Sequence, residues 1–181
     1  MTDEALYQAY LQRGDTEALR VLLERYREGL TLYLYGLVHN AGDAEELMLD
    51  AFAELAAGPT VFSGKSSFKT WLFSVGKHLA LAELRRRKRT DREQPDALAD
   101  EAPPELLLLR QEQKQQLYRA LETILPDYRE VLLLQFMEDM TPAEIAQVTG
   151  KRVKHIYNLI ERGKKALRSE LERTGFEYAE I

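Results

Sequence analysis

The chain has 181 residues, a formal net charge of −5 and no cysteine, which excludes disulfide bonds and thiolate metal sites. No stretch is long and apolar enough to cross a membrane, and the polar N-terminus does not fit a secretory signal, so we expect a cytoplasmic protein without membrane insertion. The three histidines, His39, His78 and His155, are far apart in the sequence, so neither a metal site nor a cofactor is predicted.

The net charge conceals an uneven distribution along the chain. Residues 1–64 carry four basic and eleven acidic side chains, whereas residues 65–92 carry nine basic and two acidic ones. Residues 93–105 are acidic again, and residues 144–173 carry eight basic and four acidic side chains. Because the acidic parts repel phosphate, such a chain should bind DNA poorly alone, and a partner that delivers it to DNA is expected.

Hydrophobic periodicity predicts helices over residues 3–12 and 16–38 and a third from Asp43 to about Ala57. The third helix has one apolar side and, at spacings of three, four and four, an acidic row of Asp43, Glu46, Asp50 and Glu54. Like charges at these spacings repel by a few tenths of a kcal/mol per pair. The row indicates either a protein-docking surface or an ordinary solvated face. Catalysis by these carboxylates is disfavoured because no histidine accompanies them.

Residues 58–67 combine glycine, proline and serine and are predicted to form a loop, after which Ser67 caps a helix from Phe68 to about Arg89. That helix has an apolar side with Trp71, which we assign mainly to the core, and it ends in five consecutive cations, residues 85–89. Cations complement the dipole at a helix C-terminus, but five exceed what a cap requires. With Phe62 and Lys65 in the preceding loop, the segment is typical of single-stranded nucleic acid binding, in which bases stack on aromatic rings and cations follow phosphates.

The sequence predicts an all-α fold of two small helical domains. Residues 90–104 contain three prolines and an acidic excess without helical period, which predicts a flexible acidic linker between domains at 1–89 and 105–181. The second domain should hold helices over about 105–123 and 128–137, the latter capped by Asp127. No strand pattern occurs.

Residues 141–171 have the pattern of a helix-turn-helix. Thr141, Pro142 and Glu144 form a capping box with proline at the first helical position, and Ala146 and Gly150 provide the small residue and the turn. In the following helix, one side is apolar (Val153, Ile156, Ile160, Leu167 and Leu171) and the opposite side is basic and polar (Lys154, His155, Asn158, Arg162 and Lys165). A hairpin with merely solvated cations is the alternative, but the three features together favour a helix that enters the major groove of DNA.

In this order and spacing, three segments resemble the extracytoplasmic-function (ECF) sigma factors of bacterial RNA polymerase. Residues 43–52 (DAEELMLDAF) are similar to the polymerase-docking helix of that family, and residues 68–89 to its promoter-melting and minus-ten-reading helix. Residues 125–171 resemble its minus-thirty-five-reading domain. The likeness spans about residues 5–172 and implies a sigma factor that binds core RNA polymerase and directs promoter-specific initiation.

The resemblance also implies which residues meet each partner. Core polymerase docking falls on Asp43, Glu46, Leu47, Met48, Asp50 and Glu54. Contacts with the single-stranded minus-ten DNA fall on Phe62, Lys65, Ser66, Ser67, Lys69, Ser74, Lys77, His78 and Arg85. Contacts with the minus-thirty-five duplex fall on Lys151, Arg152, Lys154, His155, Tyr157, Asn158, Arg162 and Lys165.

The chain departs from the family pattern at His78 and Ala82, where Asn and Asp are usual, and in the recognition helix around Tyr157, so an unusual promoter sequence is expected. These departures keep open a degenerate sigma-like interaction protein that does not initiate transcription. A stand-alone helix-turn-helix regulator is a second alternative, although it would leave the acidic N-terminal half without a use. An enzyme is disfavoured, because the sequence shows no pattern of a catalytic nucleophile, a metal cluster or a phosphate-binding loop. Whether an anti-sigma factor binds the chain stays open.

Overall fold

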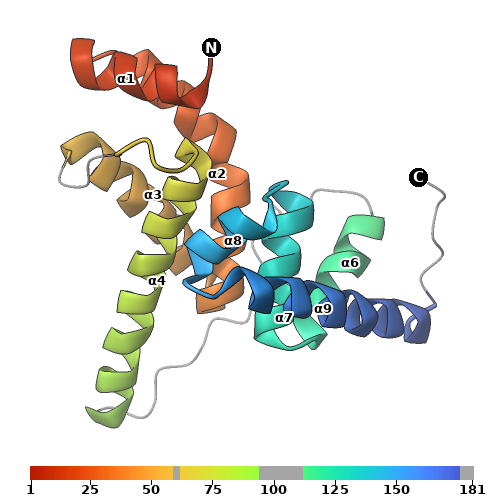
Figure 1. Ribbon diagram of the computed structural model, residues 1–181. Helices are drawn as coiled ribbons and strands as arrows, with labels where there is room; N and C mark the ends of the chain where they lie inside the picture. The colour runs from red at the N-terminus through yellow and green to blue at the C-terminus, as the bar shows by residue number, and fades with distance from the viewer. Residues whose placement is uncertain (59–61, 94–111, 176–181) are drawn as a thin grey trace. The chain divides into compact units, whose positions relative to one another are not determined.

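The computed structural model describes residues 1–58, 62–93 and 112–175, and every regular element in these ranges is helical, as the sequence predicts. The chain forms two compact units, one containing residues 1–102 and the other containing most of residues 103–181 (Figure 1). In the described residues, no helix combines the length and the apolar character needed to cross a membrane.

The first unit consists of α1 (Asp3–Arg13), α2 (Thr16–Val38), α3 (Ala41–Ala57) and α4 (Phe68–Glu93). Helix α2 is its centre, because α1, α3 and α4 all pack against it. The most completely buried side chains come from all four helices, which gives the unit one continuous core: Tyr7, Leu22, Leu30, Leu34, Met48, Leu55, Phe68, Leu72 and Phe73. Helices α3 and α4 thus share one core, and each presents its own face to solvent.

Short polar side chains begin the first three helices. Thr2, Asp15 and Asn40 each accept a hydrogen bond from the backbone N–H three residues later, which satisfies one of the unpaired donors at each helix start. Helix α2 ends at Val38, and the following residue, His39, adopts a left-handed conformation (φ 53°) and donates its N–H to the carbonyl of Tyr35. The turn between α2 and α3 is therefore only two residues long.

Arg87 joins three helices of this unit. Its guanidinium donates to the carbonyl oxygen of Val38 (2.9 Å), the last residue of α2, and to the carboxylate of Glu83 on its own helix (3.2 Å). It also forms an ion pair with Asp43 in the first turn of α3. The contacts hold the second half of α4 against the junction of α2 and α3. One cation of the basic run at 85–89 is thus engaged inside the unit.

The second unit contains α6 (Glu112–Thr123), α7 (Pro126–Leu132), the π-helix η1 (Leu133–Met137), α8 (Pro142–Thr149) and α9 (Val153–Arg173). Helices α7 and α9 approach closely at Gly163, where an added Cβ would lie 3.2 Å from Cβ of Tyr128 and 3.3 Å from the side chain of Leu132. A larger residue at this position would separate the two helices, so glycine fixes their distance.

The helix-turn-helix prediction is confirmed in its local detail. Thr141 and Glu144 form the capping box, Pro142 occupies the start of α8, and Gly150 has φ 71° and donates its N–H to the carbonyl of Ala146. The positive φ at Gly150 is a conformation that other residues adopt at a cost of about 1 kcal/mol or more. Helix α9 then begins at Val153.

Three predicted helix boundaries were wrong. Helix α4 continues to Glu93, so residues 90–93 are helical rather than part of a linker, and residues 94–111 lie outside the described ranges. Asp127 does not cap the following helix, because Pro126 already occupies its first turn and Leu125 precedes it without a side-chain cap. The last predicted turn of that helix is the π-helix η1.

We predict that Arg87→Ala lowers the free energy of unfolding of the first unit by about 1–2 kcal/mol, because it leaves the Val38 carbonyl and the Asp43 carboxylate without this donor. Urea unfolding followed by the fluorescence of Trp71, the single tryptophan, measures this unit directly. Arg85→Ala removes an exposed cation from the same helix and should change stability by less than about 0.5 kcal/mol. Equal stability of the two variants would show that the Arg87 contacts contribute nothing.

Candidate polymerase-docking and nucleic-acid surfaces

The solvent face of α3 differs from the predicted docking set. Glu46 and Asp50 are exposed, as expected, but Leu47 and Met48 are buried, with 7% and 1% of their surfaces accessible. Both lie on the side of α3 that faces the core, so they cannot meet a partner in this conformation, and their assignment as docking contacts is wrong. Leu49, which sequence reasoning passed over, is 54% exposed between these acidic residues.

The two ends of the acidic row are less accessible than its middle. Asp43 is half-buried and paired with Arg87, and Glu54 is half-buried and has an interaction of its own. Glu45 is exposed beside Glu46. We therefore define the acidic face of α3 as the exposed residues of its middle turns: Glu45, Glu46, Leu49, Asp50 and Ala53. It combines negative charge with one large apolar side chain, which a plain solvated face does not require.

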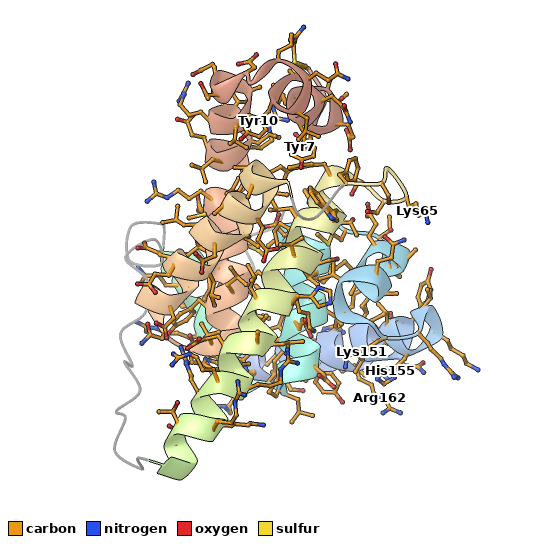
Figure 2. All side chains as sticks on the ribbon, turned by 90° about the vertical axis from the view of Figure 1, so that its left-hand side faces the viewer. Tyr7, Tyr10, Lys65, Lys151, His155 and Arg162 are labelled. Atoms are coloured by element: carbon orange, nitrogen blue, oxygen red, sulfur yellow. The ribbon has the colours of Figure 1, made fainter. Side chains whose placement is uncertain are left out.

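The segment before α4, residues 62–67, exposes few of its predicted contacts. The ring of Phe62 packs against Trp71, with ring centroids 5.2 Å apart, and so is held in an aromatic cluster instead of standing in solvent. Ser67 caps α4 as predicted, accepting from the N–H of Thr70 (3.1 Å), and Ser66 donates to the Ser67 carbonyl (3.3 Å). Lys65 is exposed and projects from the ribbon (Figure 2).

Helix α4 presents a continuous stripe of exposed residues along its solvent side. His78, Leu81, Arg85 and Lys88 are exposed and recur at helical spacing, and Lys77 is half-buried at its edge. Two other predicted contacts have internal roles. Ser74 donates to the carbonyl of Thr70 (2.8 Å), and the ammonium of Lys69 lies 5.9 Å from the centre of the Tyr26 ring. We call the exposed set His78, Leu81, Arg85 and Lys88 the α4 stripe.

Helix α9 exposes nearly all the residues predicted for it. Seven of the predicted duplex contacts are exposed: Arg152, Lys154, His155, Tyr157, Asn158, Arg162 and Lys165. Lys151, the eighth, is half-buried, with its ammonium 3.7 Å from the carboxylate of Asp127. Figure 2 labels His155 and Arg162 on this helix. The cations therefore share a solvent face of one helix that follows a tight turn.

Two residues of α9 were not placed correctly from periodicity. Val153, expected in the core, is 41% exposed, and Leu159 is buried in its stead, because the buried face is centred on Ile156, Ile160 and Gly163. Glu161 was overlooked: it is exposed in the middle of the cationic face, with its carboxylate 3.9 Å from Lys164.

The chemistry available on these surfaces is binding. In the ranges that the structure describes, no group of His, Asp and Glu side chains is arranged to hold a metal ion. What the fold does provide is an exposed cationic helix behind a glycine turn and a second exposed basic stripe on another unit. Exposed cations on two helices, one of them the second helix of a helix-turn-helix, are typical of a helical DNA-binding protein.

Comparisons with known proteins specify this class further. The family pattern described as Sigma-70 region 2 matches residues 22–90, and the pattern described as Sigma-70, region 4 matches residues 114–167, together more than half of the chain. The chain belongs to the sigma-70 family. It is a promoter-specific initiation factor for RNA polymerase, in a family of transcription regulators.

Curated relatives extend over most of the chain. The ECF RNA polymerase sigma factor SigX of Bacillus subtilis is 25% identical over 164 residues, covering 86% of this chain and 84% of its own. The ECF RNA polymerase sigma-E factor of Escherichia coli is 26% identical over 184 residues, covering 95% of each chain.

Two solved structures share the fold. The sigma factor RpoE of Bartonella quintana, solved in complex with the anti-sigma factor NepR, has a TM-score of 0.70 at 20% identity and covers 84% of this chain and 96% of its own. CnrH, solved in complex with the cytosolic domain of CnrY, has a TM-score of 0.65 at 22% identity and covers 94% and 97%.

The exposed face of α9 predicts opposite effects of its charged residues on duplex binding. In the domain from residue 105 onward, Lys154→Ala should weaken binding and reduce the slope of log affinity against log salt by about one, because one phosphate contact is lost. Arg162→Ala should weaken binding too, by about 1–3 kcal/mol where it reads a base. Glu161→Gln should strengthen binding by removing a negative charge.

Fluorescence anisotropy with a labelled duplex over a salt series measures all three variants, and circular dichroism checks that each is folded. If the lysine and arginine variants bind like the parent domain, α9 does not contact DNA through this face.

Proposed function

We propose that the acidic face of α3 is the surface with which this sigma factor docks on core polymerase. The observation that carries the proposal is the contrast between two helices packed in one unit: α3 contains no cation and exposes acid in its middle turns, whereas α4 exposes His78, Arg85 and Lys88 along its stripe. The family resemblance implies a coiled coil of the polymerase clamp as the partner. Glu46 and Asp50 would meet its cations, and Leu49 would supply an apolar contact between them.

We propose further that residues 62–67 and the α4 stripe bind the melted non-template strand at the minus-ten element. Lys65, His78 and Arg85 are the exposed polar side chains that support this role, and segment 62–67 would receive a flipped base. Phe62 is excluded from stacking on a base in this conformation because it already packs on Trp71. Cations that follow the phosphates would supply most of the affinity for DNA. Because the acidic half of the chain repels the same phosphates, docking of that half on polymerase would have to come first.

Helix α9 is proposed to read the minus-thirty-five duplex from the major groove. Asn158 and Arg162 have the side chains that pair with base edges, whereas Lys154 and Lys165 reach phosphates. The chain itself makes or breaks no bond in this scheme and acts in the cytoplasm. The resemblance to ECF factors adds an anti-sigma factor as a further proposed partner.

Charge reversal tests the docking surface. The double variant Glu46→Lys with Asp50→Lys should lower affinity for core polymerase at least tenfold, since two favourable contacts become repulsive at the interface. The matched control, Glu17→Lys with Glu24→Lys on α2, changes the net charge equally at exposed positions. It should lose little affinity. Unchanged binding of the α3 variant, measured by titration with labelled core polymerase, would remove the docking assignment.

Run-off transcription tests promoter use as a whole. Purified chain with bacterial core polymerase and fragments of the host genome should give discrete start sites that core polymerase alone does not give. Lys65→Ala and Arg85→Ala should reduce open-complex formation by about threefold or more while core binding is retained, because each removes a cation near the single strand. A chain that binds core polymerase but yields no start site would instead favour the degenerate, non-initiating alternative.

A further inference from the structure

We propose that helix α1 is a positioning element for segment 62–67, and that it thereby sets which minus-ten base the segment accepts. The inference rests on the proposed role of that segment in promoter binding. Helix α1 lies before the stretch matched by the region 2 family pattern, which begins at residue 22. Its side chains nevertheless contact the end of α3 and the start of α4, the two helices between which the segment runs.

At the end of α3, α1 satisfies backbone carbonyls that the helix itself leaves unpaired. The hydroxyl of Tyr7 donates to the carbonyl of Leu55 (3.3 Å), and the hydroxyl of Tyr10 donates to that of Ala56 (3.1 Å). The N–H of Gly58 donates a hydrogen bond to the carbonyl of Glu54 (3.2 Å). Two tyrosines of one helix thus fix the last turn of another (Figure 2).

At the start of α4, α1 supplies an acceptor for an unpaired donor. The carboxylate of Glu4 accepts from the backbone N–H of Phe68 at 3.0 Å, while Ser67 accepts from the N–H of Thr70. A carboxylate at a helix N-terminus also interacts favourably with the helix dipole. The capping of α4 is therefore shared between the residue that precedes it and a helix more than 60 residues earlier in the chain.

The segment itself is fastened to α1 by aromatic contacts. The ring of Tyr7 lies 6.4 Å from that of Phe62, 5.4 Å from Phe68 and 5.5 Å from Trp71, centroid to centroid. Phe62 is the only member of this cluster within segment 62–67. Since Tyr7 is almost completely buried, a shift of α1 must move Phe62 with it.

Helix α1 is in turn fixed to the central helix α2. Asp3 forms an ion pair with Arg25 and accepts a hydrogen bond from the hydroxyl of Tyr26. Burial, and then this hydrogen bond, raises the pKa of Tyr26 above its usual range, so the phenol stays protonated and continues to donate. Side-chain contacts thus link α2 through α1 to both flanks of the segment.

Holoenzyme selection from a DNA pool tests the proposal. The chain is combined with bacterial core polymerase and a pool of linear duplexes with a randomised minus-ten segment, and heparin-resistant complexes are sequenced. Glu4→Ala should lower the enrichment ratio of best to worst base, at the position that the segment reads, by about threefold or more. Core affinity and the unfolding midpoint should stay close to those of the parent chain.

Three further variants separate positioning from general damage. Glu4→Gln keeps an oxygen that can accept from Phe68 and should retain the parent base preference. Tyr10→Phe removes only the hydroxyl and should act like Glu4→Ala even if the latter folds poorly. Gln8→Ala, at an exposed position of α1, should leave the preference unchanged.

The outcomes distinguish the inference from the function on which it rests. If Lys65→Ala alters selection but neither Glu4→Ala nor Tyr10→Phe changes the base preference, α1 is not a positioning element. A uniform loss of recovery over all sequences would likewise reduce α1 to a structural part and overturn the inference. If Lys65→Ala also leaves selection unchanged, the proposed role of segment 62–67 fails, and the inference fails with it.

Discussion

The structure depends on how helix ends in the first unit are satisfied across long distances in sequence. A helix leaves carbonyls unpaired at its end and N–H groups unpaired at its start, and burying these without partners is costly. Here Arg87 reaches the end of α2, two tyrosines of α1 reach the end of α3, and Glu4 reaches the start of α4. The same bonds that satisfy the backbone also fix the angles between helices. Because of that dual role, the exposed faces of α3 and α4 keep a defined relation within the first unit.

Charge in this chain is arranged by helix face, and this resolves the conflict between an acidic protein and a DNA partner. A net charge of −5 would oppose binding to phosphate if the charge were spread evenly. Instead, α3 exposes acid without any cation, α4 exposes a basic stripe, and the solvent face of α9 in the other unit groups further exposed cations. The acidic residues then repel the DNA phosphates at long range, while the cations attract them at contact. An enzyme that engages the acid would remove the first and leave the second, so that DNA binding follows docking.

Local chemistry predicted the helix-turn-helix, and periodicity predicted most helices, because capping boxes, glycine turns and apolar spacing act within a few residues. Periodicity identifies a face but not its centre, which is why Val153 was placed in the core and Leu159 was not. Leu47 and Met48 were assigned to a partner from the family resemblance, which does not say which side of α3 packs against the core. The roles of Arg87, Glu4 and Phe62 depend on residues more than 40 positions away or on rings gathered by tertiary packing. A cation in a basic run and an aromatic in a loop look alike in sequence whether they face DNA or the protein. The π-helix at Leu133 similarly has no local signal that separates it from an α-helical turn.

The position of Phe62 changes how the minus-ten segment would recognise a base. With that ring packed on Trp71 and with Ser66 and Ser67 bonded locally, the described segment offers a base the exposed Ser63 and Lys65 and the backbone around Gly64, which has φ 70°. Recognition would then depend on the shape of a backbone turn and on hydrogen bonds from it, not on stacking against an aromatic ring. A turn used in this way discriminates between bases only if it is held still, because a displacement of about 1 Å suffices to lose a hydrogen bond. Under the proposed role of this segment, the rigidity supplied by the flanking helix ends would be as necessary to base choice as the residues that touch the base.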